Sequence, residues 1–219
     1  MPATVKTLPP VKSSLRTFHG DATLKKKLVA EIRKHKKMDQ IVKGTYGREN
    51  GVWEGCAVGC SIRSLCNVTG KQLATDDHFL YETEFGIPTA IAHLEDAIFE
   101  SLRDEQAKEF PLRFIKAVPV GADLSPVIPM FLAWLLDDPK DGVIRFADEV
   151  GKISIHTVAD LHRRSLIERI TDEEWTAAWD AASAAASAAA WGAASAAAWD
   201  AAWDAQANKL IEIIGSIKS

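Results

Sequence analysis

The feature that most constrains how this chain can fold is a four-residue refrain near its C-terminus. From Trp175 the tetrads read WTAA, WDAA, SAAA, SAAA, WGAA, SAAA, WDAA and WDAQ. Alanine is the best helix former and loses no side-chain entropy on folding, so the tract predicts a long helix over about residues 172–214. Thr171 to Glu174 has the pattern of a capping box, which begins a helix, and Gly215 lies at the expected end.

The same refrain predicts what surrounds this helix. Each step of four residues turns the Trp/Ser row by about 40° around the helix axis, so Trp175, Trp191 and Trp203 point in different directions. We therefore expect protein on several sides of the helix. A straight helix of about 43 residues is roughly 65 Å long, whereas a compact chain of this size is roughly 45 Å across. The excess predicts either a bend at Gly192 or a homodimer formed through this helix.

Apolar residues recur at helical spacing through most of the remaining chain, which predicts an all-α fold. We expect a mobile tail over residues 1–17 and one multi-helix domain over residues 18–219, organised around the C-terminal helix. Helices are expected from Asp21 to about Val42, from Pro88, over about 104–118, from Ser125 to Leu136, and from Thr157 to about Ile170. Asn50-Gly51 is typical of a type I′ turn, so a small β-hairpin near residues 45–53 is expected as well.

Composition bears on the compartment. Apolar runs stay well below the ~20 residues that a membrane-spanning helix needs, and no signal-type apolar segment is visible near the start. Three cysteines are an odd number for a disulfide framework. These features predict reduced thiols, a cytoplasmic location and no membrane association.

Charge is distributed unevenly along the chain. Residues 1–50 contain twelve Lys or Arg and four Asp or Glu, whereas the rest of the chain contains fourteen and twenty-six. The basic segment is a solvated face, a surface that docks on the acidic part, or a site for an anionic partner. Its lysines have no aromatic residues between them and match no DNA-reading motif, so nucleic acid is not the expected partner.

The most unusual local stretch runs from Gly55 to Cys60 (GCAVGC). If it begins a helix, the first amide groups form an anion site and lower the pKa of a thiol there. Cys56 or Cys60 would then be a nucleophile, with His78 as the expected base. The alternative is tight packing of a helix through small residues. The spacing of Cys56, Cys60, Cys66 and His78 matches no zinc module, so neither a metal nor a cofactor is predicted. His93 and Asp96 are expected to be an exposed pair.

The G-C-A-V-G-C motif, followed by an all-helical body and an Ala/Trp-rich C-terminal helix, resembles a family of uncharacterised proteins from bacteria and their phages. The resemblance covers most of the chain and implies no activity and no functional residues.

Three functions remain open from the sequence. The first is a non-catalytic binding protein, such as a phage-type inhibitor or sequestrant, that captures a protein partner or an anionic small molecule. The second is a cysteine-dependent enzyme, and the third is an assembly protein that dimerises through the C-terminal helix. The candidate ligand-binding residues are Lys34, Lys37, Gly47, Arg48, Trp53, Gly55, Cys56 and Gly59.

Overall fold

The computed structural model describes residues 14–178 and 196–219, and these are predominantly helical. The predicted all-α class is confirmed, and the sheet structure of the described residues is a two-stranded hairpin. Contacts divide the chain into two compact units. The larger unit contains Ser14–Ser125 and Trp203–Ser219, and the smaller unit contains the described part of Pro126–Ala202. The helix α9 (Ala196–Ser216) contributes residues to both units.

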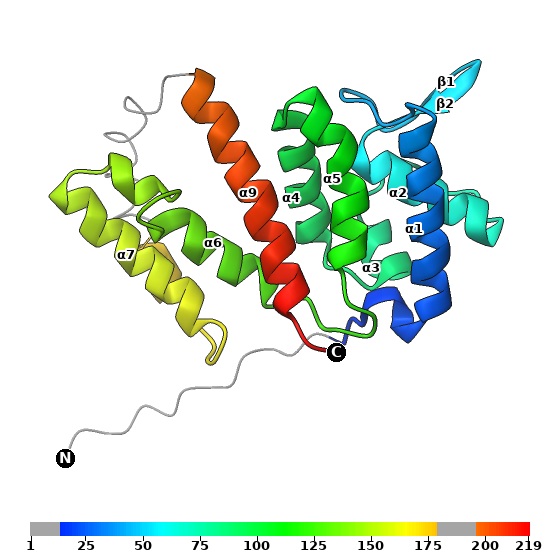
Figure 1. The fold of residues 1–219 in the computed structure, drawn as a ribbon. Coiled ribbons are helices and arrows are strands. Elements are labelled where there is room, and N and C mark those ends of the chain that lie inside the picture. Colours follow the sequence, from blue (N-terminus) through cyan, green and yellow to red (C-terminus); the bar gives the residue numbers. More distant parts are fainter. Residues whose placement is uncertain (1–13, 179–195) are drawn as a thin grey trace. The chain divides into compact units, whose positions relative to one another are not determined.

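In the larger unit, α1 to α5 lie together (Figure 1), and they pack around a core of aromatic and aliphatic side chains. Helix α1 contacts α2 and α5, and α2 also contacts α4. Phe18, Tyr81, Phe99 and Phe110 are among the fully buried side chains. The elements in chain order are η1 (Thr17–Gly20), α1 (Ala22–Lys37), β1 (Arg48–Asn50), β2 (Val52–Glu54), α2 (Ala57–Thr69), α3 (Leu80–Phe85), α4 (Thr89–Ser101) and α5 (Asp104–Ala117).

Thr17 connects the start of the described chain to the core of the larger unit. Its amide donates to Ala122 O at 3.0 Å, and its hydroxyl donates to Pro119 O and accepts from the Ala122 amide at 2.9 Å. Buried backbone groups must be paired in this way. The sequence placed Thr17 at the end of a tail, and the structure places it at the edge of the core.

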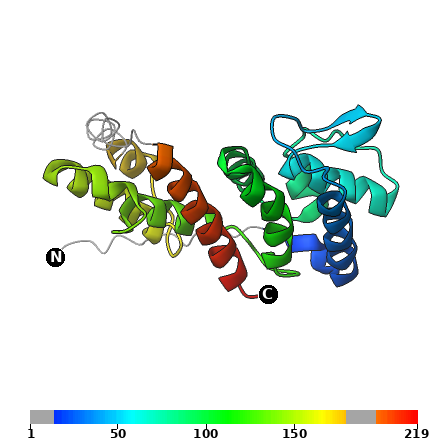
Figure 2. The same ribbon diagram turned by 45° about the horizontal axis from the view of Figure 1, so that its top comes forward.

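The small hairpin forms where the turn signal predicts it. Strands β1 and β2 are antiparallel, with Glu49 opposite Trp53 and Gly51 in the turn at φ +80°. Glycine adopts this left-handed conformation without strain. Figures 1 and 2 show the hairpin at the edge of the group formed by α1, α2 and α5.

Helix α1 ends earlier than the sequence predicts. It begins at the expected place, with Asp21 accepting hydrogen bonds from the amides of Thr23 and Leu24. It ends at Lys37 instead of Val42, because Asp39 adopts a left-handed conformation (φ +58°) that breaks the helical run. Met38, which follows the last residue of the helix, is consequently 60 % exposed.

The smaller unit is built on a pair of helices. Helix α6 (Val127–Asp137) packs against α7 (Glu149–Arg164), and the short helix η2 (Val143–Phe146) connects them. Thr157 was expected to begin the helix that is now α7, but Asp148, which lies well before Thr157, caps this helix by accepting from the Gly151 amide. Thr157 instead donates its hydroxyl to Ile153 O inside the helix.

The predicted start of the long C-terminal helix is present. Residues 172–178 are helical, Thr171 N donates to the Glu174 carboxylate, and Glu174 N donates to the Thr171 hydroxyl. This is the reciprocal capping box. Trp175 packs on Leu161, Ile170 and Ala178. Residues 179–195, which include Trp191 and the predicted bend at Gly192, lie outside the described part, so continuity over 172–214 stays a prediction. Among the described helices, none has the length and apolar character of a membrane-spanning segment.

Candidate functional site

The Gly/Cys stretch lies under the loop that connects α1 to the hairpin. The loop is held on both sides: Cys56 N donates to Thr45 O at 2.7 Å, and Gly44 N donates to the Glu100 carboxylate of α4 at 3.0 Å. A Cβ atom on Gly59 would lie 1.8 Å from Tyr46 O, and one on Gly55 would lie 2.8 Å from it. Glycine is required at both positions because the loop backbone rests directly on them. Tight packing therefore accounts for the small residues.

Cys56 caps the N-terminus of α2, and its thiol does not have the lowered pKa that the nucleophile alternative requires. Its Sγ accepts from the Gly59 amide at 3.5 Å, and the residue is 1 % exposed. Burial, with a further contribution from the Asp96 and Glu100 charges, raises the pKa of the thiol to about 12. Desolvation disfavours the thiolate more than the helix amides favour it. Cys56 is therefore a neutral thiol near pH 7.

Cys60 is also an unsuitable nucleophile. It is fully buried, its Sγ lies 3.3 Å from Gly55 O, and burial raises the pKa of its thiol well above the ordinary value. In the part of the chain that the structure describes, neither thiol is hydrogen-bonded to His78. The predicted thiol–imidazole pair is absent from these residues.

Asp96 of α4 is the centre of the polar cluster next to Cys56. Its Oδ2 accepts from the Tyr46 hydroxyl at 2.7 Å and lies 3.3 Å from Nε2 of His78. The His78 ring stacks on His93 at a centroid distance of 4.2 Å. The expectation that His93 and Asp96 form an exposed pair is therefore wrong for Asp96, whose side chain is only 15 % exposed.

A second buried carboxyl, Glu95, lies on the inner side of the same helix. It is 0 % exposed and accepts from the Tyr81 hydroxyl at 2.8 Å. Burial raises the pKa of Glu95 to about 8, so this carboxyl is mostly neutral at pH 7. The Glu95 side chain is therefore part of the core of the larger unit.

The hairpin residues chosen from the sequence have structural contacts. Arg48 forms an ion pair with Glu54 across the two strands. The Trp53 ring lies 5.1 Å from His35 of α1 and 5.7 Å from the Arg63 guanidinium. A Cβ on Gly47 would lie 3.1 Å from Nε1 of Trp53. The hairpin is thus fixed to the end of α1 by its tryptophan.

Helix α1 presents a row of exposed cations. Lys34 pairs with Glu31, and Lys36 pairs with Glu109 of α5. Within the described residues, four other cations of this helix form neither an ion pair nor a hydrogen bond: Lys26, Lys27, Arg33 and Lys37. We call these four the α1 cation row. Of the two lysines predicted to bind a ligand, Lys37 belongs to this row, whereas Lys34 is paired with Glu31.

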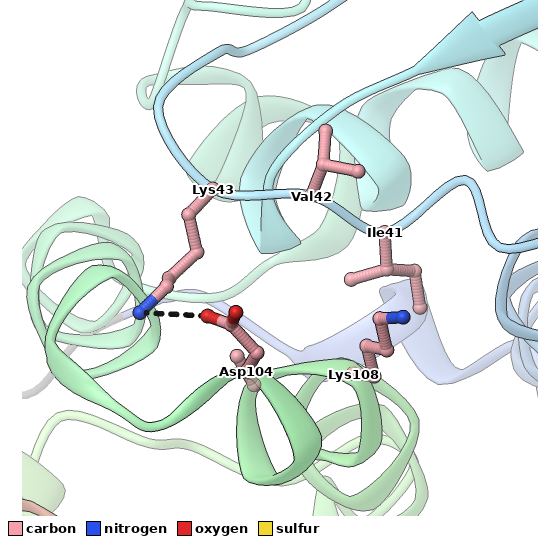
Figure 3. A pocket seen from close by; sticks show the side chains of 6 residues that line it. Ile41, Val42, Lys43, Asp104 and Lys108 are labelled. Atoms are coloured by element: carbon pink, nitrogen blue, oxygen red, sulfur yellow. Dashed lines mark ion pairs between the residues drawn. The ribbon is translucent and has the colours of Figure 1, made fainter.

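A pocket of about 270 Å³ lies between the loop residues 41–43, which follow α1, and the start of α5 (Figure 3). Lys43 and Lys108 line it. Lys43 pairs with Asp104 at 3.3 Å, and Lys108 pairs with Asp39 at 2.6 Å. Because both cations are neutralised, the pocket offers no net attraction for an anion, and none of the residues predicted to bind a ligand lines it.

Sequence reasoning missed Tyr46, Asp96 and Glu100. Tyr46 lies on the loop before the hairpin, whereas Asp96 and Glu100 lie on α4, far along the chain from Tyr46 and Cys56. The available signal was the helical spacing of Asp96 and Glu100, which puts two carboxylates on one face of α4. No residue pattern reveals that the α2 N-terminus faces them.

Fold and site together define an all-α protein with a buried, acid-flanked thiol and a basic helix face. No protein family model, no curated protein and no solved structure matches the chain.

Proposed function

We propose that the chain is a non-catalytic binding protein that docks the acidic surface of a partner protein against the exposed face of α1. The observation that carries the proposal is the α1 cation row. Four exposed cations gather on one helix, whereas other lysines of the same unit have carboxylate partners, such as Lys71 with Glu84. Unpaired charges of one sign attract a partner of opposite sign and speed its association.

The dimensions of the row favour a protein over a small anion. Lys26 and Lys37 are eleven residues apart on α1, and at 1.5 Å per residue this corresponds to about 16 Å along the axis. Charges spread over such a length match an extended surface. The Gly/Cys stretch, the other candidate for an anion, faces the carboxylates of Asp96 and Glu100. That environment repels an anion.

The same environment argues against the cysteine-dependent enzyme. A nucleophilic thiol needs a nearby base or cation that favours the thiolate. Burial and two acidic neighbours act in the opposite direction on Cys56. The assembly alternative depends on the Ala/Trp tract, of which residues 179–195 lie outside the described part.

The test uses labelled polyglutamate as the acidic probe and fluorescence anisotropy as the readout. The variant K26Q/K27Q/R33Q/K37Q removes the α1 cation row. A control, R48Q/K71Q/K108Q/K152Q, removes the same net charge at four cations that have carboxylate partners. We expect the first variant to lose about tenfold or more in affinity and the control to lose much less, with binding weakened by salt.

Two results would overturn the proposal. Equal losses in both variants would mean that the probe responds only to net charge. Tighter binding of duplex DNA than of polyglutamate would point to a nucleic acid as the partner of α1.

A further inference from the structure

The polar cluster beside Cys56 contains three groups that can bind a metal ion. The Sγ atom of Cys56 and one carboxylate oxygen each of Asp96 and Glu100 all lie within 4.8 Å of one another. Cys56 comes from the N-terminus of α2, and the two acids come from one face of α4. Three ligand atoms from two rigid helices form a preorganised set around one point.

One of the two carboxylate oxygens of Asp96 has no hydrogen-bond partner among the residues that the structure describes. Oδ2 accepts from Tyr46 and is also near His78, whereas Oδ1 is buried and has no hydrogen-bond partner among the described residues. A buried carboxylate oxygen without a partner is costly, and native structures normally satisfy such atoms. A bound cation would satisfy it.

The charges around the cluster also favour a cation. Asp96 and Glu100 are four residues apart on one helix, where like charges repel. The charge of Lys43 acts on Glu100, but the direct partners of its ammonium group are Leu102 O and Asp104. Glu100 accepts from the Gly44 amide, which compensates only part of its charge. The two carboxylates therefore lie side by side next to an apolar, buried thiol.

We propose that Cys56, Asp96 and Glu100 bind one divalent transition-metal ion of the zinc class. The thiol loses its proton to solvent as the sulfur–metal bond forms, so the thiolate and the two carboxylates more than neutralise a divalent ion and the occupied site keeps one net negative charge. Sulfur is a soft ligand that favours zinc over magnesium or calcium. Tyr46 and His78 position Asp96 through its second oxygen, as outer groups do in known metal sites.

The residues of the site differ in their exposure to solvent. Cys56 is 1 % exposed, whereas Tyr46 is 37 % exposed and Glu100 lies at the surface. Of the three ligands, Glu100 is therefore the one nearest to solvent and Cys56 the most deeply buried. The site uses none of the α1 cations, so this inference is independent of the proposed partner binding.

The test is a titration of the reduced full-length chain with Co²⁺, followed by competition with Zn²⁺. Thiolate ligation to Co²⁺ gives a charge-transfer absorption band that carboxylates alone do not give. We expect one Co²⁺ per chain with this band, full displacement by Zn²⁺, and no displacement by Mg²⁺ at the same concentration.

Three variants assign the ligands. Cys56→Ser should abolish the band and still fold, because serine is a favoured N-cap residue. Cys66→Ser is the matched control, since Cys66 lies on the same helix outside the cluster, and it should keep the band. Asp96→Asn should weaken Zn²⁺ binding by at least about tenfold.

The proposal is overturned by an absent band in the wild-type chain, or by a band that survives in Cys56→Ser. Loss of the band in Cys66→Ser would mean that Cys66, and not Cys56, supplies the thiolate, and this result would also overturn the proposal. An unchanged Zn²⁺ affinity in Asp96→Asn would contradict the ligand set. Circular dichroism of each variant separates these outcomes from unfolding.

Discussion

At the scale of single residues, Gly59 shows how a loop determines an amino acid in a helix. The carbonyl of Tyr46 occupies the space that a side chain would need, because a Cβ on Gly59 would lie 1.8 Å from Tyr46 O. The residue is not needed for backbone freedom. It is needed because two backbones touch, and the loop cannot move without breaking the bonds that Gly44 and Thr45 make.

We predict that Gly59→Ala destabilises the larger unit by about 1–3 kcal/mol, the usual range for overpacking a closed site. Gly215→Ala is the matched control, because a Cβ there meets nothing within 4 Å. It should be neutral or stabilising, since alanine is favoured over glycine in a helix. Urea denaturation of both variants measures the difference. Equal stability of the two variants would show that the loop yields to the methyl group.

His35 gives the larger unit a dependence on pH. It is 5 % exposed, and its Nδ1 lies 2.7 Å from Gln40 Oε1. An amide oxygen can only accept, so Nδ1 carries the proton of the neutral ring. Nε2 is then an acceptor without a partner among the described residues. Burial accordingly lowers the pKa of His35.

The sign of the effect on stability follows from this shift. The unfolded chain binds a proton at about pH 6.5, but the folded chain binds it only at lower pH. The contribution of His35 is complete above about pH 6.5 and decreases as the pH falls below that value. We predict that the free energy of unfolding falls less between pH 7.5 and 5.5 in His35→Gln than in the wild type. His19→Gln, at an exposed position, should keep the wild-type slope. A wild-type slope in His35→Gln would contradict the prediction.

At the scale of elements, helix formation was predictable from the sequence and helix boundaries were less so. Helical spacing of apolar residues predicted α1, α4 and α5 because burial of one face stabilises a helix wherever it packs. Helix α1 ends where Asp39 adopts a left-handed conformation. Just beyond this residue, Gln40 pairs with the buried His35 of α1. That pairing is tertiary, so local pattern could not reveal it.

The start of α7 was missed for a related reason. Asp148 and Thr157 are both favoured cap residues, and the sequence offers no basis for choosing between them. Helix α7 packs against α6, and Gly151 and Ile155, which precede Thr157, are buried, so the longer helix is the more stable one. Tertiary contacts thus decided between two local signals of similar strength.

The candidate site was predictable only in part, because it also depends on contacts between residues that are distant in sequence. The sequence singled out the Gly55–Cys60 stretch as a possible helix start, and the structure begins α2 there, with Cys56 as its cap. The sequence could not identify the groups that face the thiol. The acids Asp96 and Glu100 come from another helix, and they change the expected thiolate into a neutral thiol. Local sequence predicts the position of a reactive group, whereas long-range packing determines its charge.

At the scale of the whole molecule, the chain forms two compact units, each with its own core. Phe110 is completely buried among the helices of the larger unit, and Leu161 lies in the apolar cluster of the smaller one with Ile170 and Ala178. Truncating a buried Phe costs about 3–5 kcal/mol and a buried Leu about 2–5 kcal/mol. If each core stabilises mainly its own unit, these costs should be felt locally.

We therefore predict that Phe110→Ala increases amide hydrogen exchange throughout residues 14–125 and leaves residues 126–178 close to the wild type. Leu161→Ala should do the reverse. Hydrogen-exchange mass spectrometry of the two variants, each compared with the wild type, makes the measurement peptide by peptide. The pair is its own control, because each variant reports on the unit that the other leaves unchanged. If either substitution increases exchange equally in both ranges, the two units unfold as one cooperative structure. The separation of the cores would then have no thermodynamic consequence.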